Sequence, residues 1–179
     1  MKQLLKAIRF AAEKHSEQRR KNSAATPYIN HPIEVAEYLC LVGDVHDESI
    51  LIAAILHDTL EDTETDPNEI RDIFGEEVLG MVVECTDDKS LEKSERKRLQ
   101  VVNARSKSSG AKQIKIADKT CNLRSILEDP PAGWPISRQI EYFQWAADVV
   151  DGLKGVNLKL DEQVDKVIES GLSRLNDTP

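Results

Sequence analysis

Four ionisable residues stand within six positions at the end of an apolar run, in the stretch AAILHDTLEDT. They are His57, Asp58, Glu61 and Asp62, with no lysine or arginine among them. In a continuous helix begun near Ser49, His57 and Glu61 lie one above the other at i and i+4, and so do Asp58 and Asp62. Imidazole and carboxylate are ligands of divalent transition metals. We therefore expect His57 and Asp58 to hold an ion, with the two later carboxylates standing over its open positions.

Two other helices are predicted to offer further metal ligands. His31 stands at an expected helix start, where Ser, Thr, Asp or Asn is the usual cap. Asp118 lies within the apolar run AKQIKIADKTCNLRSIL, where a carboxylate needs a partner. A salt bridge from Asp118 to Lys115 or Arg124 is the alternative explanation. The predicted set for one divalent ion, with positions open for water and substrate, is two imidazoles and two carboxylates: His31, His57, Asp58 and Asp118.

Any anionic ligand must meet a local basic cluster, because the whole chain carries a formal net charge of −8. The polar loop EQRRKNSAATP is the leading candidate, since Arg19, Arg20 and Lys21 follow one another there. A second basic segment, EKSERKRLQ, has Glu92 and Glu95 among its cations. These cations, Lys93, Arg96, Lys97 and Arg98, could reach an anionic ligand, but the interleaved pattern favours a solvated helix face with local ion pairs.

The composition excludes several classes of protein. A net charge of −8 opposes a general binder of nucleic acid or of acidic membranes, since these need a broad basic face. The cysteines, Cys40, Cys85 and Cys121, stand singly, which predicts reduced and mostly buried thiols. Lys6 and Arg9 interrupt the N-terminal apolar residues, so we expect a core-facing helix there and no signal peptide. No stretch reaches membrane-spanning length, and a cytoplasmic protein is the expectation.

Helical periodicity dominates the 179 residues and predicts one all-α domain over residues 1–179. Residues 105–110, RSKSSG, are expected to form a mobile segment. The amphipathic helix expected over 136–153 could face the core or a second subunit, which leaves monomer and homodimer open. The other clear helices are expected close to these ranges: 2–16, 32–42, 47–63, 66–75, 78–85 and 157–172.

The pattern H…HD…D, with HDTLEDT at its centre and KIADKTCNLRSI later, resembles the hydrolase domain of the RelA/SpoT alarmone enzymes within the HD superfamily. The segments YINHP, TDDKSLEKSERKRLQV and EYFQWAADVV are similar to its free-standing metazoan branch, and the resemblance spans nearly the whole chain. It implies an HD-domain helical bundle that uses one Mn²⁺ ion. The implied reaction removes the 3′-pyrophosphate of guanosine 3′,5′-bis(diphosphate), ppGpp, an alarmone of the starvation response, to give GDP and pyrophosphate.

The resemblance also implies roles for individual residues. The family's metal ligands match His31, His57, Asp58 and Asp118. Its catalytic acidic pair matches Glu61 and Asp62, which suits a base beside an ion-activated water. Its substrate contacts match Arg20, Lys21 and Asn122. The pair Thr120–Cys121 departs from relatives that often carry a larger aromatic or His pair there, which leaves the base contacts open.

Three alternatives remain at this level. The same metal site could remove the 2′-phosphate of NADPH, since both substrates carry a phosphate on ribose beside a base. A nucleotide sensor without turnover is a second alternative, which the intact acidic pair opposes. A two-metal phosphodiesterase is less expected, because only His15 and His46 remain as spare imidazoles. The ligand set also suits Fe, Co or Zn. The hydrolase prediction and each of these alternatives imply a small-molecule nucleotide as the partner.

Overall fold

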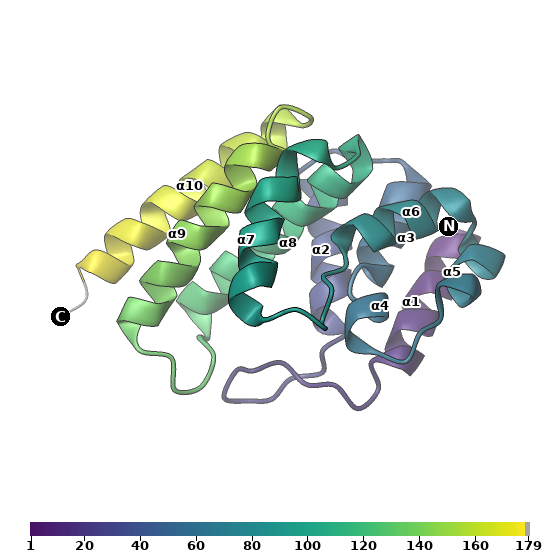
Figure 1. The fold of residues 1–179 in the computed structure, drawn as a ribbon, viewed down its shortest axis with the longest axis horizontal. Helices are drawn as coiled ribbons and strands as arrows, with labels where there is room; N and C mark the ends of the chain where they lie inside the picture. Colours follow the sequence, from purple (N-terminus) through teal and green to yellow (C-terminus); the bar gives the residue numbers. More distant parts are fainter. Residues whose placement is uncertain (178–179) are drawn as a thin grey trace.

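The computed structural model describes residues 1–177, which form an all-α protein with no strand in that range, as predicted (Figure 1). The helices are α1 (Lys2–Lys14), α2 (Asn30–Leu41), α3 (Glu48–Leu56), α4 (Thr59–Asp62), α5 (Pro67–Phe74), α6 (Glu76–Cys85), α7 (Lys93–Asn103), the short 3-10 helix η1 (Ala104–Ser106), α8 (Ser109–Glu128), α9 (Ile136–Leu153) and α10 (Leu158–Asn176). None of these helices is long and apolar enough to cross a membrane.

Helix α8 runs through the middle of the molecule, with α1 to α6 on one side and α9 and α10 on the other (Figure 1). Its central residues, 114–121, are all buried, including the charged ones. Helix α7 packs on α9 and completes the outer side of the second half. Two long loops, 15–29 and 129–135, lie at the lower edge in this view (Figure 1). Because α8 contacts both halves, residues on it can meet residues from nearly every other element.

Side-chain caps fix several helix starts where the sequence predicts them. The Asp47 carboxylate accepts the amide of Ser49 at 2.8 Å and begins α3. Asp66 and Glu69 form a reciprocal capping box at the start of α5. The predicted range 136–153 is that of α9, whereas α1 is shorter than expected and α10 is longer.

The segment 105–110 is ordered, which differs from the mobile loop that the sequence predicts. Its first residues complete η1, and Gly110 lies in the first turn of α8. A Cβ atom on Gly110 would stand 2.3 Å from the Met81 sulfur, so a larger residue would require the Met81 side chain to move. In this segment the glycine marks a close contact between two helices, whereas its polar composition predicted a loop.

The central stretch is broken, and the expected continuous helix through it is wrong. Helix α3 ends at Leu56, and α4 is a separate turn that begins at Thr59. The His57 ring donates to the Ala54 carbonyl at 2.8 Å, and the Thr59 hydroxyl donates to the Leu56 carbonyl at 2.7 Å. These side chains occupy carbonyls that would otherwise accept the next helical amides. The break separates the metal-ligand candidates from the acidic pair.

The main hydrophobic core lies between α1, α2, α3, α6 and α8. A second cluster joins α8, α9 and α10 around Phe143, which is fully buried. Cys85 and Cys121 are buried and Cys40 is partly buried; all are free thiols, as predicted. The two clusters hold the middle of α8 rigidly from both sides.

Candidate active site

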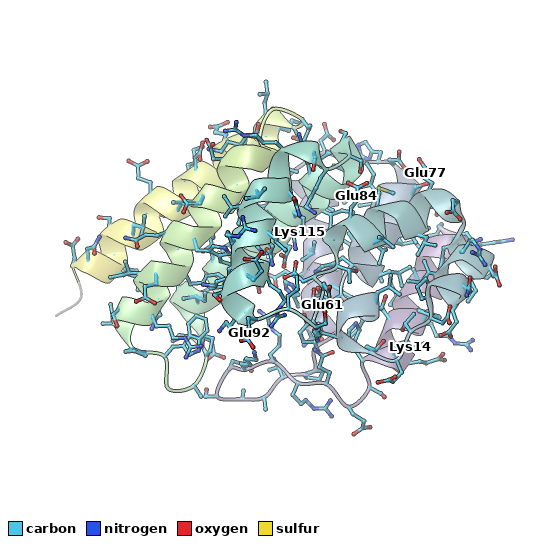
Figure 2. All side chains as sticks on the ribbon, in the orientation of Figure 1. Lys14, Glu61, Glu77, Glu84, Glu92 and Lys115 are labelled. Carbon is cyan, nitrogen blue, oxygen red and sulfur yellow. The ribbon has the colours of Figure 1, made fainter. Side chains whose placement is uncertain are left out.

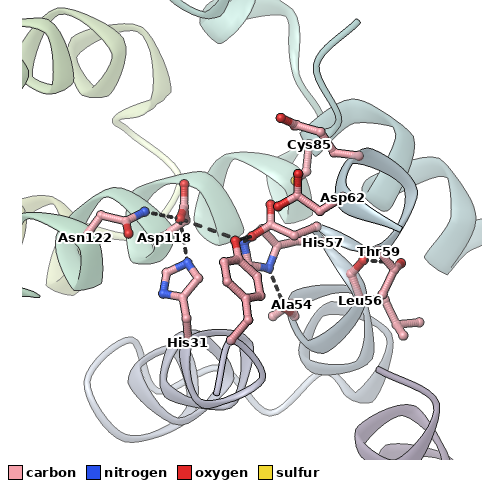
Figure 3. A network of polar contacts seen from close by, with 12 residues as sticks. His31, Ala54, Leu56, His57, Thr59, Asp62, Cys85, Asp118 and Asn122 are labelled. Carbon is pink, nitrogen blue, oxygen red and sulfur yellow. Dashed lines mark hydrogen bonds and ion pairs between the residues drawn. The ribbon is translucent and has the colours of Figure 1, made fainter. Parts of the chain in front are cut away.

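Three predicted metal ligands from three elements meet at the centre of the protein (Figure 3). His31 comes from the first turn of α2, His57 from the end of α3 and Asp118 from the middle of α8. Their donor atoms all lie within 4.8 Å of one another. All three residues are at least nine-tenths buried, with 2%, 1% and 5% exposed. Such a convergence of two imidazoles and a carboxylate away from water is suited to a transition ion.

Asp58 joins this cluster from the turn after α3. Its Oδ2 lies 3.0 Å from His57 Nε2 and accepts a hydrogen bond from the Tyr28 hydroxyl at 2.5 Å. Burial and the Asp58 charge raise the pKa of Tyr28, which keeps its hydroxyl protonated and a donor. The tertiary structure thus brings three of the predicted metal ligands together and places the fourth, Asp58, beside His57.

The protonation of His57 supports a role in metal binding. Its Nδ1 faces the Ala54 carbonyl, so Nδ1 carries the hydrogen and Nε2 points toward the carboxylates. His57 Nε2 is buried and makes no hydrogen bond within the described residues. Burial alone lowers the pKa of His57, but Asp58 and Asp118 outweigh it and raise that pKa. The same two carboxylates that attract a proton here would attract a metal cation in its place.

The two oxygens of Asp118 have different surroundings. Oδ1 lies 3.1 Å from His31 Nε2 and accepts from Asn122 Nδ2 at 2.6 Å. Oδ2 lies 3.1 Å from Lys119 Nζ and 3.9 Å from Lys115 Nζ. Of the two salt-bridge partners considered from sequence, Lys115 is near, whereas Arg124 stacks over the Tyr38 ring instead. One carboxylate thereby serves both the metal-ligand cluster and a buried cationic pair.

The acidic pair lies beside the cluster, on the separate turn α4. Glu61 Oε2 accepts the Asp87 amide at 3.0 Å, and its Oε1 stands 3.8 Å from Arg96 Nη1 (Figure 2). Asp62 accepts from Gln18 Nε2 at 2.9 Å and forms an ion pair with Lys89. Burial raises the pKa of Glu61, which favours proton uptake by this carboxylate.

A cavity of about 610 Å³ opens next to these residues, within the usual size of small-molecule sites. The substrate contacts expected from the family resemblance, Arg20, Lys21 and Asn122, all line it. Arg20 Nη2 donates to Asn122 Oδ1 at 3.2 Å, which ties the basic loop to α8. Asp62 also lines the cavity, whereas Glu61 turns toward α7. None of the four predicted metal ligands lines this cavity, but Tyr28 and Asn122 do, and these two donate to Asp58 and Asp118. The metal-ligand cluster therefore lies directly behind the cavity wall.

A second basic wall comes from α7, whose cations were predicted to lie on a solvated face, with contact to an anionic ligand as the alternative. Lys93, Arg96 and Lys97 line the cavity, which favours the alternative for these three. Arg98 does form the expected exposed ion pair, with Glu95. The signal was present in the spacing: positions 93, 96, 97 and 100 share one face of a helix.

Sequence reasoning missed an aromatic wall of the same cavity. Trp134, Tyr142 and Trp145 line the cavity. The ring centroids of Trp134 and Tyr142 lie 5.8 Å apart, and those of Tyr142 and Trp145 lie 5.2 Å apart. Cations cover the ends of this wall: Arg138 lies 4.4 Å from the Trp134 ring and Lys97 lies 4.6 Å from the Trp145 ring. Successive rings are inclined to each other by 55° and 65°, so each ring offers its own face, and an aromatic face beside cations suits a nucleobase beside phosphates.

Comparison with known proteins gives consistent matches. The sequence matches the HD domain family over residues 7–144. The guanosine-3′,5′-bis(diphosphate) 3′-pyrophosphohydrolase MESH1 of Xenopus tropicalis is 51% identical over 162 residues, which cover 90% of each chain. The protein of that name from Homo sapiens is 53% identical over 160 residues, 89% of each chain. A solved structure described as a metazoan ortholog of SpoT that hydrolyzes ppGpp superposes with a TM-score of 0.91 at 46% identity, covering 95% of this chain and 96% of that one.

Proposed function

The chain belongs to the HD domain family and to its metazoan SpoT-type branch, and we propose that it is a Mn²⁺-dependent hydrolase that converts ppGpp to GDP and pyrophosphate. One observation carries the proposal: the buried residues His31, His57 and Asp118, with Asp58 beside them, lie directly behind the wall of a cavity lined by cations and aromatic rings, and Tyr28 and Asn122 connect the two. The relatives named for this reaction match nearly the whole chain, which extends the likeness to both walls of the cavity.

The metal ion would be held by His31, His57, Asp58 and Asp118. A divalent ion bound there supplies Lewis-acid chemistry, since it acidifies water and polarises a phosphoryl oxygen. The buried Nε2 of His57 fits this role, because it points at two carboxylates and has no hydrogen-bond partner in residues 1–177. Histidine and carboxylate ligands accept Mn²⁺ and also other first-row ions.

The acidic pair would move the proton of the attacking water. Water oxygen attacks the phosphorus attached to the ribose 3′-oxygen, the bond between that phosphorus and O3′ breaks, and the water oxygen remains on the released pyrophosphate. O3′ takes up a proton as it leaves, which balances the proton lost by the water, and becomes the hydroxyl of GDP. Glu61 takes the water proton, and its raised pKa suits a base that works near neutral pH. Asp62, which lines the cavity and is fixed by Gln18, orients the same water.

The two basic walls would neutralise the phosphates. Arg20 and Lys21 approach from the loop, and Lys93 and Arg96 approach from α7 on another side of the cavity. Phosphoryl transfer gathers charge on phosphate oxygens, and donors already aimed at those oxygens stabilise that charge. The guanine base then stacks on the wall formed by Trp134 and Tyr142. The local basic cluster accounts for anion binding by a protein whose formal net charge is −8.

The experiment is product analysis with metal-stripped protein resupplied with Mn²⁺. We would give ppGpp and NADPH in parallel reactions and separate the products by chromatography, with Asp58→Ala as the blank. We expect GDP and pyrophosphate from ppGpp, absent in the blank. Phosphate release from NADPH alone would move the assignment to a 2′-phosphatase. Tight ppGpp binding without any product would instead indicate a sensor.

We further propose that the protein is cytoplasmic and acts as a monomer or homodimer.

A further inference from the structure

Two lysines lie buried behind the metal-ligand cluster and have no part in the mechanism above. Lys119 and Lys115 are 4% and 6% exposed, and both face Asp118 Oδ2. Lys119 is the nearer, at 3.1 Å, while Lys115 at 3.9 Å also donates to the Cys85 carbonyl. Figure 2 shows Lys115 near the middle of the molecule. Neither lysine lines the cavity.

The two lysines offset the two carboxylates of the metal-ligand cluster. Asp58 and Asp118 contribute two negative charges, and Lys115 and Lys119 contribute two positive ones. A divalent ion bound there would add two positive charges beside the lysines. Because Asp118 and both lysines are buried, their charges act on one another with little screening.

Trp145 separates Lys119 from the cavity. The ammonium of Lys119 lies 4.9 Å from the Trp145 ring centroid, and that ring lines the cavity. The indole Nε1 donates to the Lys97 carbonyl at 3.1 Å, which fixes the ring to α7. Lys119 is thus shielded from a substrate in the cavity and can act on it only through Asp118 and through its electric field.

We propose that Lys119 is a positioning residue that holds Asp118 Oδ2, turns Oδ1 toward the imidazoles, and keeps the metal centre electropositive. This inference rests on the proposed function. The charge of Lys119 opposes ion binding, yet it adds to the positive field that the phosphate meets in the transition state. A lysine present only for folding would not act on ion binding and turnover in opposite directions.

The test uses three variants of the whole chain. Lys119→Met removes the charge at similar length, and Lys119→Arg retains it. Thr120→Val is the matched control, because Thr120 is fully buried on the same helix and its hydroxyl bonds only within α8, to the Ile116 carbonyl at 2.7 Å. The readouts are the Mn²⁺ dissociation constant, measured by the EPR signal of free Mn²⁺ with stripped protein, and kcat and KM for ppGpp at saturating Mn²⁺.

We expect K119M to bind Mn²⁺ about tenfold more tightly and to lose about tenfold in kcat, with KM nearly unchanged. K119R should return both values to within about threefold of the wild type, and T120V should match the wild type. A parallel loss of Mn²⁺ affinity and kcat in K119M, or no change in either, would overturn the proposal.

Two further outcomes are also decisive. Should K119M not fold, Lys115→Met removes the more distant charge. This variant must also bind Mn²⁺ more tightly and lose kcat, each by a smaller factor than is expected for K119M. Should the wild type release no product from ppGpp, the proposed function fails on its own. The Mn²⁺ measurement then decides the role of Lys119, because tighter binding by K119M supports it and unchanged or weaker binding refutes it.

Discussion

Asp118 Oδ1 and His31 Nε2 lie 3.1 Å apart, although the two residues come from the middle of α8 and the first turn of α2. The packing of α2 against α8 makes this contact, and the break after α3 brings His57 within 3.8 Å of the same oxygen. Asp118 is therefore the point on which both histidines converge, and substitutions around it give the clearest tests.

Asp118→Asn should abolish Mn²⁺ binding and lower the free energy of unfolding by about 3 kcal/mol. The amide carries no charge to attract the ion, and it leaves Lys119 and Lys115 buried without their counter-charge. Calorimetric Mn²⁺ titration and urea denaturation measure the two effects. Asp72→Asn, at an exposed position, should change neither. Normal Mn²⁺ affinity in D118N would remove this residue from the metal site.

Mn²⁺ should stabilise the folded protein, and a chelator should reverse the effect. Ligands that bind only the native state raise the unfolding free energy by about 2.7 kcal/mol at 100 times their dissociation constant. Thermal melts across a Mn²⁺ series measure the shift. In Asp58→Ala the shift should shrink strongly, since one predicted ligand is missing. An equal shift in both proteins would place the stabilising ion elsewhere.

Glu61→Gln should lower kcat by about 10² to 10⁴-fold while Mn²⁺ binding persists. Glutamine can still accept the Asp87 amide, but it cannot take a proton from water. Steady-state ppGpp hydrolysis at saturating Mn²⁺ gives the comparison. Glu64→Gln, three positions along and exposed, is the matched control and should retain full turnover. If E61Q retained it too, Asp62 would become the candidate base.

The stability of Glu61→Gln should exceed that of the wild type increasingly as the pH rises. Burial raises the pKa of Glu61 in the folded protein. The stability that its protonated form contributes is present below the unfolded-state pKa and is lost as the pH rises through the folded-state pKa. The gain in E61Q should reach the order of 1 kcal/mol at pH 8 and fade near pH 4, as urea denaturation would show. A gain independent of pH would contradict the shifted titration.

Trp134→Ala should raise KM for ppGpp about tenfold with little change in kcat. The indole lies on the aromatic wall, away from the metal-ligand cluster, and stacking on a base is worth about 1 to 3 kcal/mol. Arg138→Ala is the companion variant, because its guanidinium covers the same ring at 4.4 Å. Initial rates over a range of ppGpp concentrations separate KM from kcat. A loss in kcat alone would exclude base stacking on Trp134.

The sequence by itself determined the helices, most of their starts, and the types of metal ligand. Apolar periodicity and caps such as Asp47 and the Asp66–Glu69 box depend on residues a few positions apart, so they can be read locally. The residues His31, His57, Asp58 and Asp118 were predicted as a set from their chemistry as metal ligands, although Asp118 also had Lys115 and Arg124 as possible partners nearby in the sequence. The family resemblance rested on the same short motifs.

Only the tertiary structure decided how these residues meet and what surrounds them. The turn at His57 depends on side-chain hydrogen bonds that compete with the helix, which periodicity does not register. One basic wall of the cavity belongs to α7, and its aromatic wall belongs to the 129–135 loop and α9. Lys119 is the lysine nearest to Asp118, at 3.1 Å. These contacts join elements distant in sequence, and the packing of α8 between the two halves of the protein fixes them.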